Sequence, residues 1–109
     1  MTFYHVVSFR TKTPEGLAQL TEGFLKLPGQ CLHPTTNKTY ISAAKGGKQI
    51  STEGIDRGMQ VTFIMEFETK ADLAYYLDED PVHDQFKKKV GAEYGVEEVV
   101  ALDFNEGAY

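Results

Sequence analysis

Histidine and tyrosine are the side chains of this sequence that could carry acid–base chemistry. The 109 residues include three His and six Tyr but a single Cys. A His titrates near neutral pH and can act as a general base, and a Tyr hydroxyl can donate a hydrogen bond to an oxygen that gains negative charge. His5 lies in an apolar run, whereas Tyr76 and His83 lie on either side of Asp80-Pro81. The surrounding elements decide whether these residues can meet.

The pattern of apolar residues predicts four strands and three helices. Strands are indicated by β-branched and aromatic residues in alternation, and helices by apolar residues three or four positions apart behind capping residues. The predicted strands are 3–9, 40–43, 59–67 and 98–104, and the predicted helices are about 14–27, about 70 to the break at Asp80-Pro81, and 81–90. This order is that of a ferredoxin-like α+β fold with a split second helix, in one domain over residues 1–109.

Glycine and proline mark the expected breaks between these elements. Pro28-Gly29 is predicted to end the first helix. The glycine-rich segment 45–58 is predicted to be a long surface loop. Its Gly46-Gly47-Lys48 lacks the spacing of a phosphate-binding loop, so we interpret it as a turn or a lid at a pocket mouth.

The two faces of the predicted sheet have different expected partners. Helices cover only one face of a ferredoxin-like sheet, and we expect His5, Val7 and Phe9 to point toward them and toward any pocket. The other face also carries apolar or uncharged residues, namely Tyr4, Val6, Thr62 and Ile64. An apolar face without helices needs a partner, so we predict a homodimer that packs sheet against sheet.

Composition and charge exclude several classes of function. A net charge of −5 provides no electrostatic footprint for binding nucleic acid or an anionic membrane. The sequence has no run of apolar residues long enough to span a bilayer and no secretory signal, which leads us to expect a cytoplasmic protein. No dinucleotide-binding fingerprint or haem-ligand signature is present, and no cofactor is expected.

Most other reactive side chains have an ordinary structural interpretation. The three His are far apart in sequence, so no metal site is expected, and His33 is interpreted as a surface residue. The acidic cluster Asp78, Glu79, Asp80 and Asp84 is interpreted as a solvated corner. Cys31 has no basic neighbour in sequence that would make it a nucleophile.

Several segments together resemble the stress-responsive A/B barrel (Dabb) family over about residues 3–104. They are the opening His5-Val6-Val7-Ser8-Phe9, the glycine-containing Ser42–Lys48 and Ser51–Gly54, the Tyr75–Leu77 and Asp80–His83 motifs with Phe86, and the closing Val99–Phe104. The resemblance implies a dimeric α+β barrel with a pocket between the sheet and the helices of each subunit.

The family includes a plant polyketide cyclase that closes its substrate by an aldol-type condensation without a cofactor. By this resemblance the catalytic residues are His5, Tyr76 and His83, with His83 as base, Tyr76 as hydrogen-bond donor and His5 as an orienting group. The substrate would be a small apolar or phenolic metabolite. The residues expected to bind it are Val7, Phe9, Phe24, Val61, Phe63 and Phe86.

The sequence also departs from the family pattern. Family members often carry Thr-His early in the third strand, where this chain has Gln60-Val61. This substitution favours an alternative in which the protein is a non-catalytic stress-response or ligand-carrier dimer. In that interpretation His83 pins the start of its helix, Tyr76 fills the core, and His5 is a core residue with a satisfied hydrogen bond.

Overall fold

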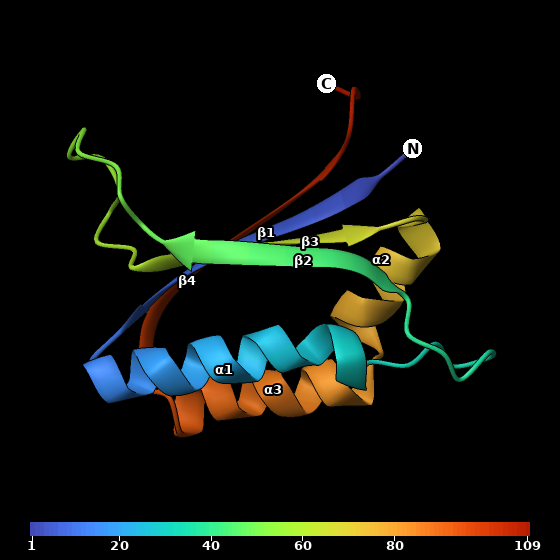
Figure 1. Ribbon diagram of the computed structural model, residues 1–109, viewed down its shortest axis with the longest axis horizontal. Helices are drawn as coiled ribbons and strands as arrows, with labels where there is room; N and C mark the ends of the chain where they lie inside the picture. Colours follow the sequence, from blue (N-terminus) through green and yellow to red (C-terminus); the bar gives the residue numbers. More distant parts are fainter.

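The computed structural model describes residues 1–109 as a sheet with helices packed on one face (Figure 1). The strands are β1 (Phe3–Thr11), β2 (Ile41–Lys48), β3 (Val61–Phe67) and β4 (Val96–Asn105), and the helices are α1 (Pro14–Gln30), α2 (Lys70–Asp78) and α3 (Pro81–Ala92). The element order confirms the predicted ferredoxin-like α+β fold. Most boundaries lie within a few residues of those predicted, but the end of α1 and the extent of β2 need correction.

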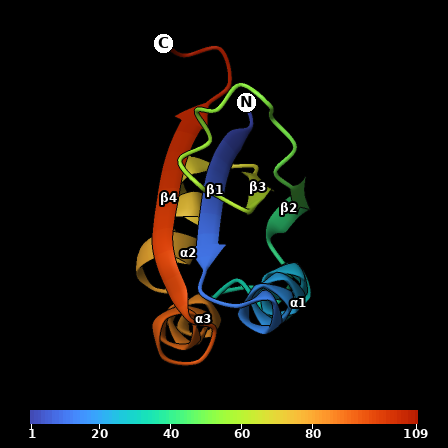
Figure 2. The same cartoon turned by 90° about the vertical axis from the view of Figure 1, so that its left-hand side faces the viewer.

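The four strands form one antiparallel sheet in the order β2-β3-β1-β4 (Figure 2). Strand β1 is central, and every second residue from His5 to Thr11 is buried, as expected for a strand with one covered face. In the register between β1 and β4, His5 lies opposite Asp103. This pairing brings the Asp103 carboxylate beside the His5 ring.

The first correction concerns α1, which continues through Pro28 to Gln30 instead of ending at Pro28. Pro28 lacks the N–H that would donate to the Phe24 carbonyl, so proline is unfavourable at this position inside a helix. Packing outweighs this cost, because Leu27 and Cys31 are almost fully buried and the Cys31 N–H donates to the Leu27 carbonyl at 2.9 Å.

The second correction concerns Gly46-Gly47-Lys48, which belongs to β2 and is neither a turn nor a lid. A Cβ at Gly46 would come within 2.5 Å of the Phe63 ring, so the glycine allows β2 to lie against that ring. The loop that follows Lys48 contributes no residue to the cavity that holds His5 and His83.

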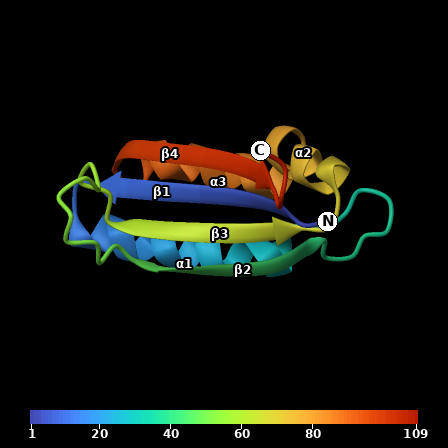
Figure 3. The same ribbon diagram turned by 90° about the horizontal axis from the view of Figure 1, so that it is seen from above.

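The two faces of the sheet are very different. The helix-covered face holds an aromatic core in which Phe24 stacks on Phe63 at 4.1 Å between ring centroids and meets Phe9 edge-on. The opposite face lies free of any helix (Figure 3). On that face Leu102 is 65% exposed and Phe104, stacked on Tyr4, is 49% exposed. The predicted second apolar face therefore exists.

Candidate functional site

His83 is positioned by the break between α2 and α3. Asp80 is the N-cap of α3, and its carboxylate accepts hydrogen bonds from the backbone N–H groups of Val82 at 2.8 Å and His83 at 3.4 Å. Pro81 occupies the first helical position, where its missing N–H costs nothing. The cap and the proline together place His83 in the first turn of α3, directed back toward α2.

The hydrogen bond made by His83 fixes which ring nitrogen is free. Its Nδ1 lies 2.7 Å from the Tyr76 carbonyl oxygen. A carbonyl oxygen only accepts, so Nδ1 carries the proton and Nε2 keeps its lone pair. No group of the protein hydrogen-bonds to that Nε2. The neutral imidazole is thus held in the tautomer that a general base requires.

The surroundings of His83 favour its neutral form. His83 is buried, and its ring stacks on the Tyr76 ring with 3.9 Å between the centroids. Burial lowers the pKa of His83 below its usual value, with further lowering by the charges of Lys87 and His5, while the bond to the Tyr76 carbonyl and Asp80 partly oppose it. At neutral pH His83 is therefore an unprotonated base.

His5 is oriented by a carboxylate on the neighbouring strand. Its Nδ1 lies 2.7 Å from Oδ1 of Asp103, its cross-strand partner. The Nδ1–H donates to this carboxylate, which leaves Nε2 as the second ring nitrogen without a partner in the protein. Sequence reasoning missed Asp103. The only signal was a single acidic residue within the apolar run Val99–Phe104.

His5 and His83 line the same cavity, of about 260 Å³, between the sheet and α3. Four of the six expected substrate-binding residues also line it, namely Val7, Phe9, Phe24 and Phe86. Sequence reasoning missed five other lining residues: Leu77, Lys87, Val90, Val99 and Ala101. Val99 is 42% exposed, so the cavity opens along β4, where the helices cover the sheet least.

Val61 and Phe63 do not line the cavity that holds the two histidines. They line a separate depression of about 510 Å³ between α1, β2 and β3. The sheet order explains this difference, because β1 lies between β3 and β4 and only β1 and β4 face the cavity beside α3. The structure therefore does not bring these two residues to the histidines.

Tyr76 contacts both histidines without lining the cavity. Its ring lies stacked on His83 and edge-on to His5, with 5.8 Å between the Tyr76 and His5 centroids. The side chain is fully buried, and its hydroxyl has no hydrogen-bond partner in the protein. Burial, with smaller contributions from Cys31 and Asp80, raises the pKa of Tyr76 above its usual value, so the phenol stays protonated.

Asp80 and Cys31 belong to a buried polar cluster behind the cavity. The Tyr40 hydroxyl donates to Asp80, which is only 2% exposed, so the prediction of a solvated acidic corner is wrong for this residue. Burial and the nearby Asp80 carboxylate raise the pKa of Cys31 to about 12. Its thiol is consequently protonated and a poor nucleophile.

His33 lies apart from the other two histidines. It is half-buried beside Tyr40 and Tyr75, and its Nδ1 accepts a hydrogen bond from the Thr35 N–H at 3.1 Å. No group of three His, Cys, Asp or Glu side chains is placed to hold a metal ion. No helix is long and apolar enough to cross a membrane.

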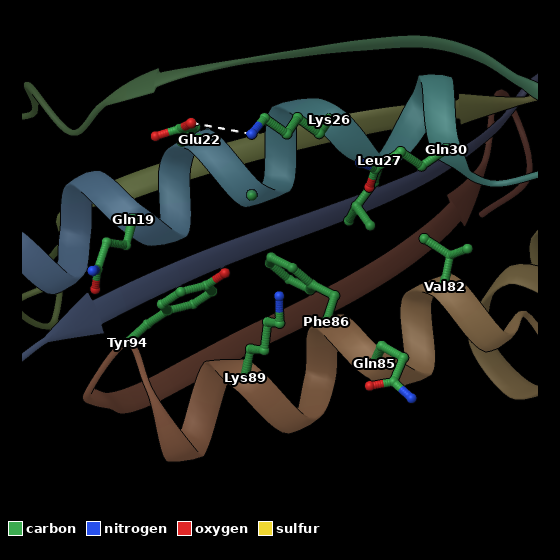
Figure 4. Close-up of a pocket in the computed structure, with 11 residues that line it drawn as sticks. Gln19, Glu22, Lys26, Leu27, Gln30, Val82, Gln85, Phe86, Lys89 and Tyr94 are labelled. Carbon is green, nitrogen blue, oxygen red and sulfur yellow. Dashed lines mark hydrogen bonds and ion pairs between the residues drawn. The ribbon is translucent and has the colours of Figure 1, made fainter.

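A larger groove of about 510 Å³ lies between α1 and α3 (Figure 4). Tyr94 and Lys89 extend into it, while Glu22 and Lys26 on α1 pair with each other at 3.1 Å. The groove contains no histidine or cysteine, and Phe86 separates it from the cavity of the two histidines. The smaller, apolar cavity is therefore the better candidate for chemistry.

Known structures share this fold over nearly the whole chain. A crystal structure of an Arabidopsis thaliana protein is 24% identical, with a TM-score of 0.78, and the match covers 98% of this chain and 97% of that one. Hydroxynitrile lyase from Passiflora edulis is 19% identical, with a TM-score of 0.76 and coverage of 99% and 97%. A dimeric ferredoxin-like protein of unknown function from Jannaschia is 16% identical, with a TM-score of 0.73 and coverage of 96% and 99%.

No curated protein matches the sequence. The stress-responsive A/B barrel domain, in contrast, matches residues 3–106, which is almost the full length. The split between α2 and α3, the order of the strands and the uncovered apolar face of the sheet agree with this match. The chain belongs to the stress-responsive A/B barrel (Dabb) family.

Proposed function

We propose that the cavity beside α3 binds a compact apolar carbonyl compound and that His83 removes a proton from the carbon next to the carbonyl. One observation carries this proposal. Two histidines line a single apolar cavity, and in each of them Nδ1 is engaged in a hydrogen bond while Nε2 has no partner in the protein. Such a pair provides one base and one group that can polarise an oxygen.

The proposed chemistry needs no cofactor. The Nε2 lone pair of His83 accepts the proton, and the electron pair of the broken C–H bond moves onto the carbonyl oxygen to give an enolate. His5 is held by the Asp103 carboxylate through Nδ1, and its Nε2, when it carries a proton, donates a hydrogen bond to that oxygen. The enolate carbon can then attack a second carbonyl, as in an aldol-type cyclisation, and the alkoxide that forms takes the proton back from Nε2 of His83. Reversal of such a step is a lyase reaction, the class named for the Passiflora edulis neighbour.

Tyr76 acts in this proposal through His83. Its carbonyl fixes the tautomer of His83, and its ring holds the plane of the imidazole by stacking. The hydroxyl, which the family resemblance assigns as a donor to substrate, is buried outside the cavity lining. We therefore place Tyr76 as a positioning residue.

The size of the cavity limits the ligand. A volume of about 260 Å³ equals roughly nine water molecules at ~30 Å³ each. This space suits one ring with short substituents and is too small for a long folded chain. The apolar wall formed by Val7, Phe9 and Phe86 favours an aromatic or aliphatic body with few polar atoms.

A proton-exchange assay tests the base without knowledge of the natural substrate. Acetophenone in D₂O exchanges its methyl protons when a base removes them, and proton NMR follows the loss of signal. The wild-type protein should accelerate exchange over His83→Gln by on the order of 10²-fold, a typical general-base contribution. His33→Gln, which changes a histidine outside the cavity, should retain the wild-type rate. Equal exchange by wild type and His83→Gln would refute the proposed base.

The alternative is a non-catalytic ligand carrier. It is favoured by the position of the Tyr76 hydroxyl outside the cavity and by Val61 in place of the histidine common in the family. A carrier would bind acetophenone in the same cavity without accelerating the exchange of its protons. The same NMR samples therefore distinguish an enzyme from a carrier.

We also propose that two copies pack through the uncovered face of the sheet. Several structural neighbours are described as dimeric, and the exposed Val100, Leu102 and Phe104 form an apolar row along β4 on this face. Patches of this kind on small domains mark interaction surfaces. Sedimentation of the wild-type protein should give the mass of a dimer, and a monomer at every concentration tested would contradict the proposal.

A further inference from the structure

Lys87 is the only fully charged side chain on the wall of the histidine cavity. It lies on α3 one turn after His83, and residues four apart on a helix are neighbours with about 5–6 Å between Cβ atoms. Its Nζ donates to the Leu77 carbonyl near the C-terminal end of α2, at 3.2 Å. An ammonium group has three donors, so two remain free.

No carboxylate of the protein neutralises Lys87. The neighbouring Lys88 pairs with Asp84 at 3.3 Å, but Lys87 makes no ion pair. No Asp or Glu lines the cavity, and the Asp103 carboxylate is already engaged with His5. An unpaired cation at the edge of an apolar cavity is complementary to an apolar molecule that carries one negative charge.

We propose that Lys87 anchors a carboxylate of the ligand, so that the molecule bound beside the histidines is a compact apolar oxo acid. This inference rests on the proposed function of the cavity and names the substrate class. A carboxylate fits better than a phosphate because the anchor is a single flexible ammonium and no guanidinium lines the cavity. The one-turn separation from His83 places the carboxylate at the rim while the ketone reaches the base inside.

A purely structural role for Lys87 makes a different prediction. As a cap on the last turn of α2, it would contribute to stability through the Leu77 carbonyl. It would not discriminate between a charged ligand and a neutral one of the same shape. Discrimination by charge is therefore the readout that separates the two roles.

The test compares para-acetylbenzoate with para-acetylbenzamide, which have the same shape and differ in charge. Calorimetric titration of the full-length wild-type protein should show the acid binding about fivefold more tightly, as expected for an exposed charge pair of up to about 1 kcal/mol. Lys87→Met should remove this preference, and Lys87→Arg, which retains the cation, should preserve it. Raising the salt concentration should weaken binding of the acid and leave the amide unchanged.

Lys89→Met is the matched control. It removes the same charge from the same helix, but Lys89 extends into the groove between α1 and α3 (Figure 4). The preference for the acid should survive this change. A preference that persists in Lys87→Met, or is lost equally in Lys89→Met, would overturn the anchor role.

The outcomes also separate this inference from the proposed function. If the amide binds at the two histidines and the acid does not, Lys87 is not an anchor although the cavity still takes a carbonyl compound. If neither probe binds the wild-type protein, the cavity is not a carbonyl site and both proposals fail.

Discussion

Removal of the buried Tyr76 hydroxyl should stabilise the protein, whereas most substitutions in a protein lower its stability. We expect Tyr76→Phe to raise the free energy of unfolding. The hydroxyl has no hydrogen-bond partner in the protein, and burying such a group costs about 1–3 kcal/mol by comparison with mutational data. Phenylalanine removes that cost and keeps the ring that stacks on His83 and packs against Phe67 at 5.4 Å.

The size of the expected gain in stability follows from the loss of the hydroxyl alone. The backbone carbonyl that bonds to His83 is retained, so the tautomer of His83 should not change. We expect a gain of about 1 kcal/mol, the lower end of the range for an unpartnered buried hydroxyl. For a domain of this size, such a gain raises the melting temperature by about 4–8 °C.

Tyr40→Phe is the control, and it should lower the free energy of unfolding. The Tyr40 hydroxyl donates to the buried Asp80 carboxylate, and hydrogen bonds to charged groups contribute about 1.5–3 kcal/mol. Urea unfolding followed by far-ultraviolet circular dichroism, at one fixed protein concentration, measures both variants. A loss of 1 kcal/mol or more in Tyr76→Phe, near the mean value of one hydrogen bond, would show that its hydroxyl is partnered and that the reasoning is wrong.

Three further predictions address the sheet and the titration of His83. Gly46→Ala should lower the free energy of unfolding by about 1–3 kcal/mol because its Cβ would overlap the Phe63 ring, whereas Gly47→Ala, with open space around it, should be close to neutral in the same urea titration. Leu102→Lys should convert the proposed dimer to a monomer in sedimentation experiments by placing two like charges across its interface. Because the pKa of His83 is lowered in the folded state, the unfolded state binds more protons. The contribution of neutral His83 to the free energy of unfolding is therefore full above pH about 6.5 and is lost as the pH falls toward the lowered pKa. The urea midpoint of His83→Gln should lack this part of the pH dependence.

The sequence was sufficient to predict the fold and the covered face of β1. The alternation of His5, Val7 and Phe9 with Val6 and Ser8 identified the residues that face the helices, because side chains along a strand alternate with a period of two. The capping residues Thr13 and Thr69 placed the starts of α1 and α2, since their side-chain oxygens accept hydrogen bonds from backbone N–H groups in the structure.

The missed features depend on contacts between distant segments. Asp103 meets His5 only through the register of β1 with β4, and the position of Lys87 depends on the angle between α2 and α3. Pro28 lies inside a helix because burial of Leu27 outweighs a local preference, and Gly46 lies in a strand because an aromatic ring from β3 needs the space. Local patterns carry none of this information.

The central claim is that one cavity presents His5 and His83 to a compact carbonyl compound. The most direct measurement is a titration of the wild-type protein with acetophenone, followed by the imidazole proton NMR signals of the three histidines. We expect the signals of His5 and His83 to shift and to saturate with one common dissociation constant, whereas His33, outside the cavity, should not respond. Equal shifts at all three histidines, or none at His5 and His83, would contradict it.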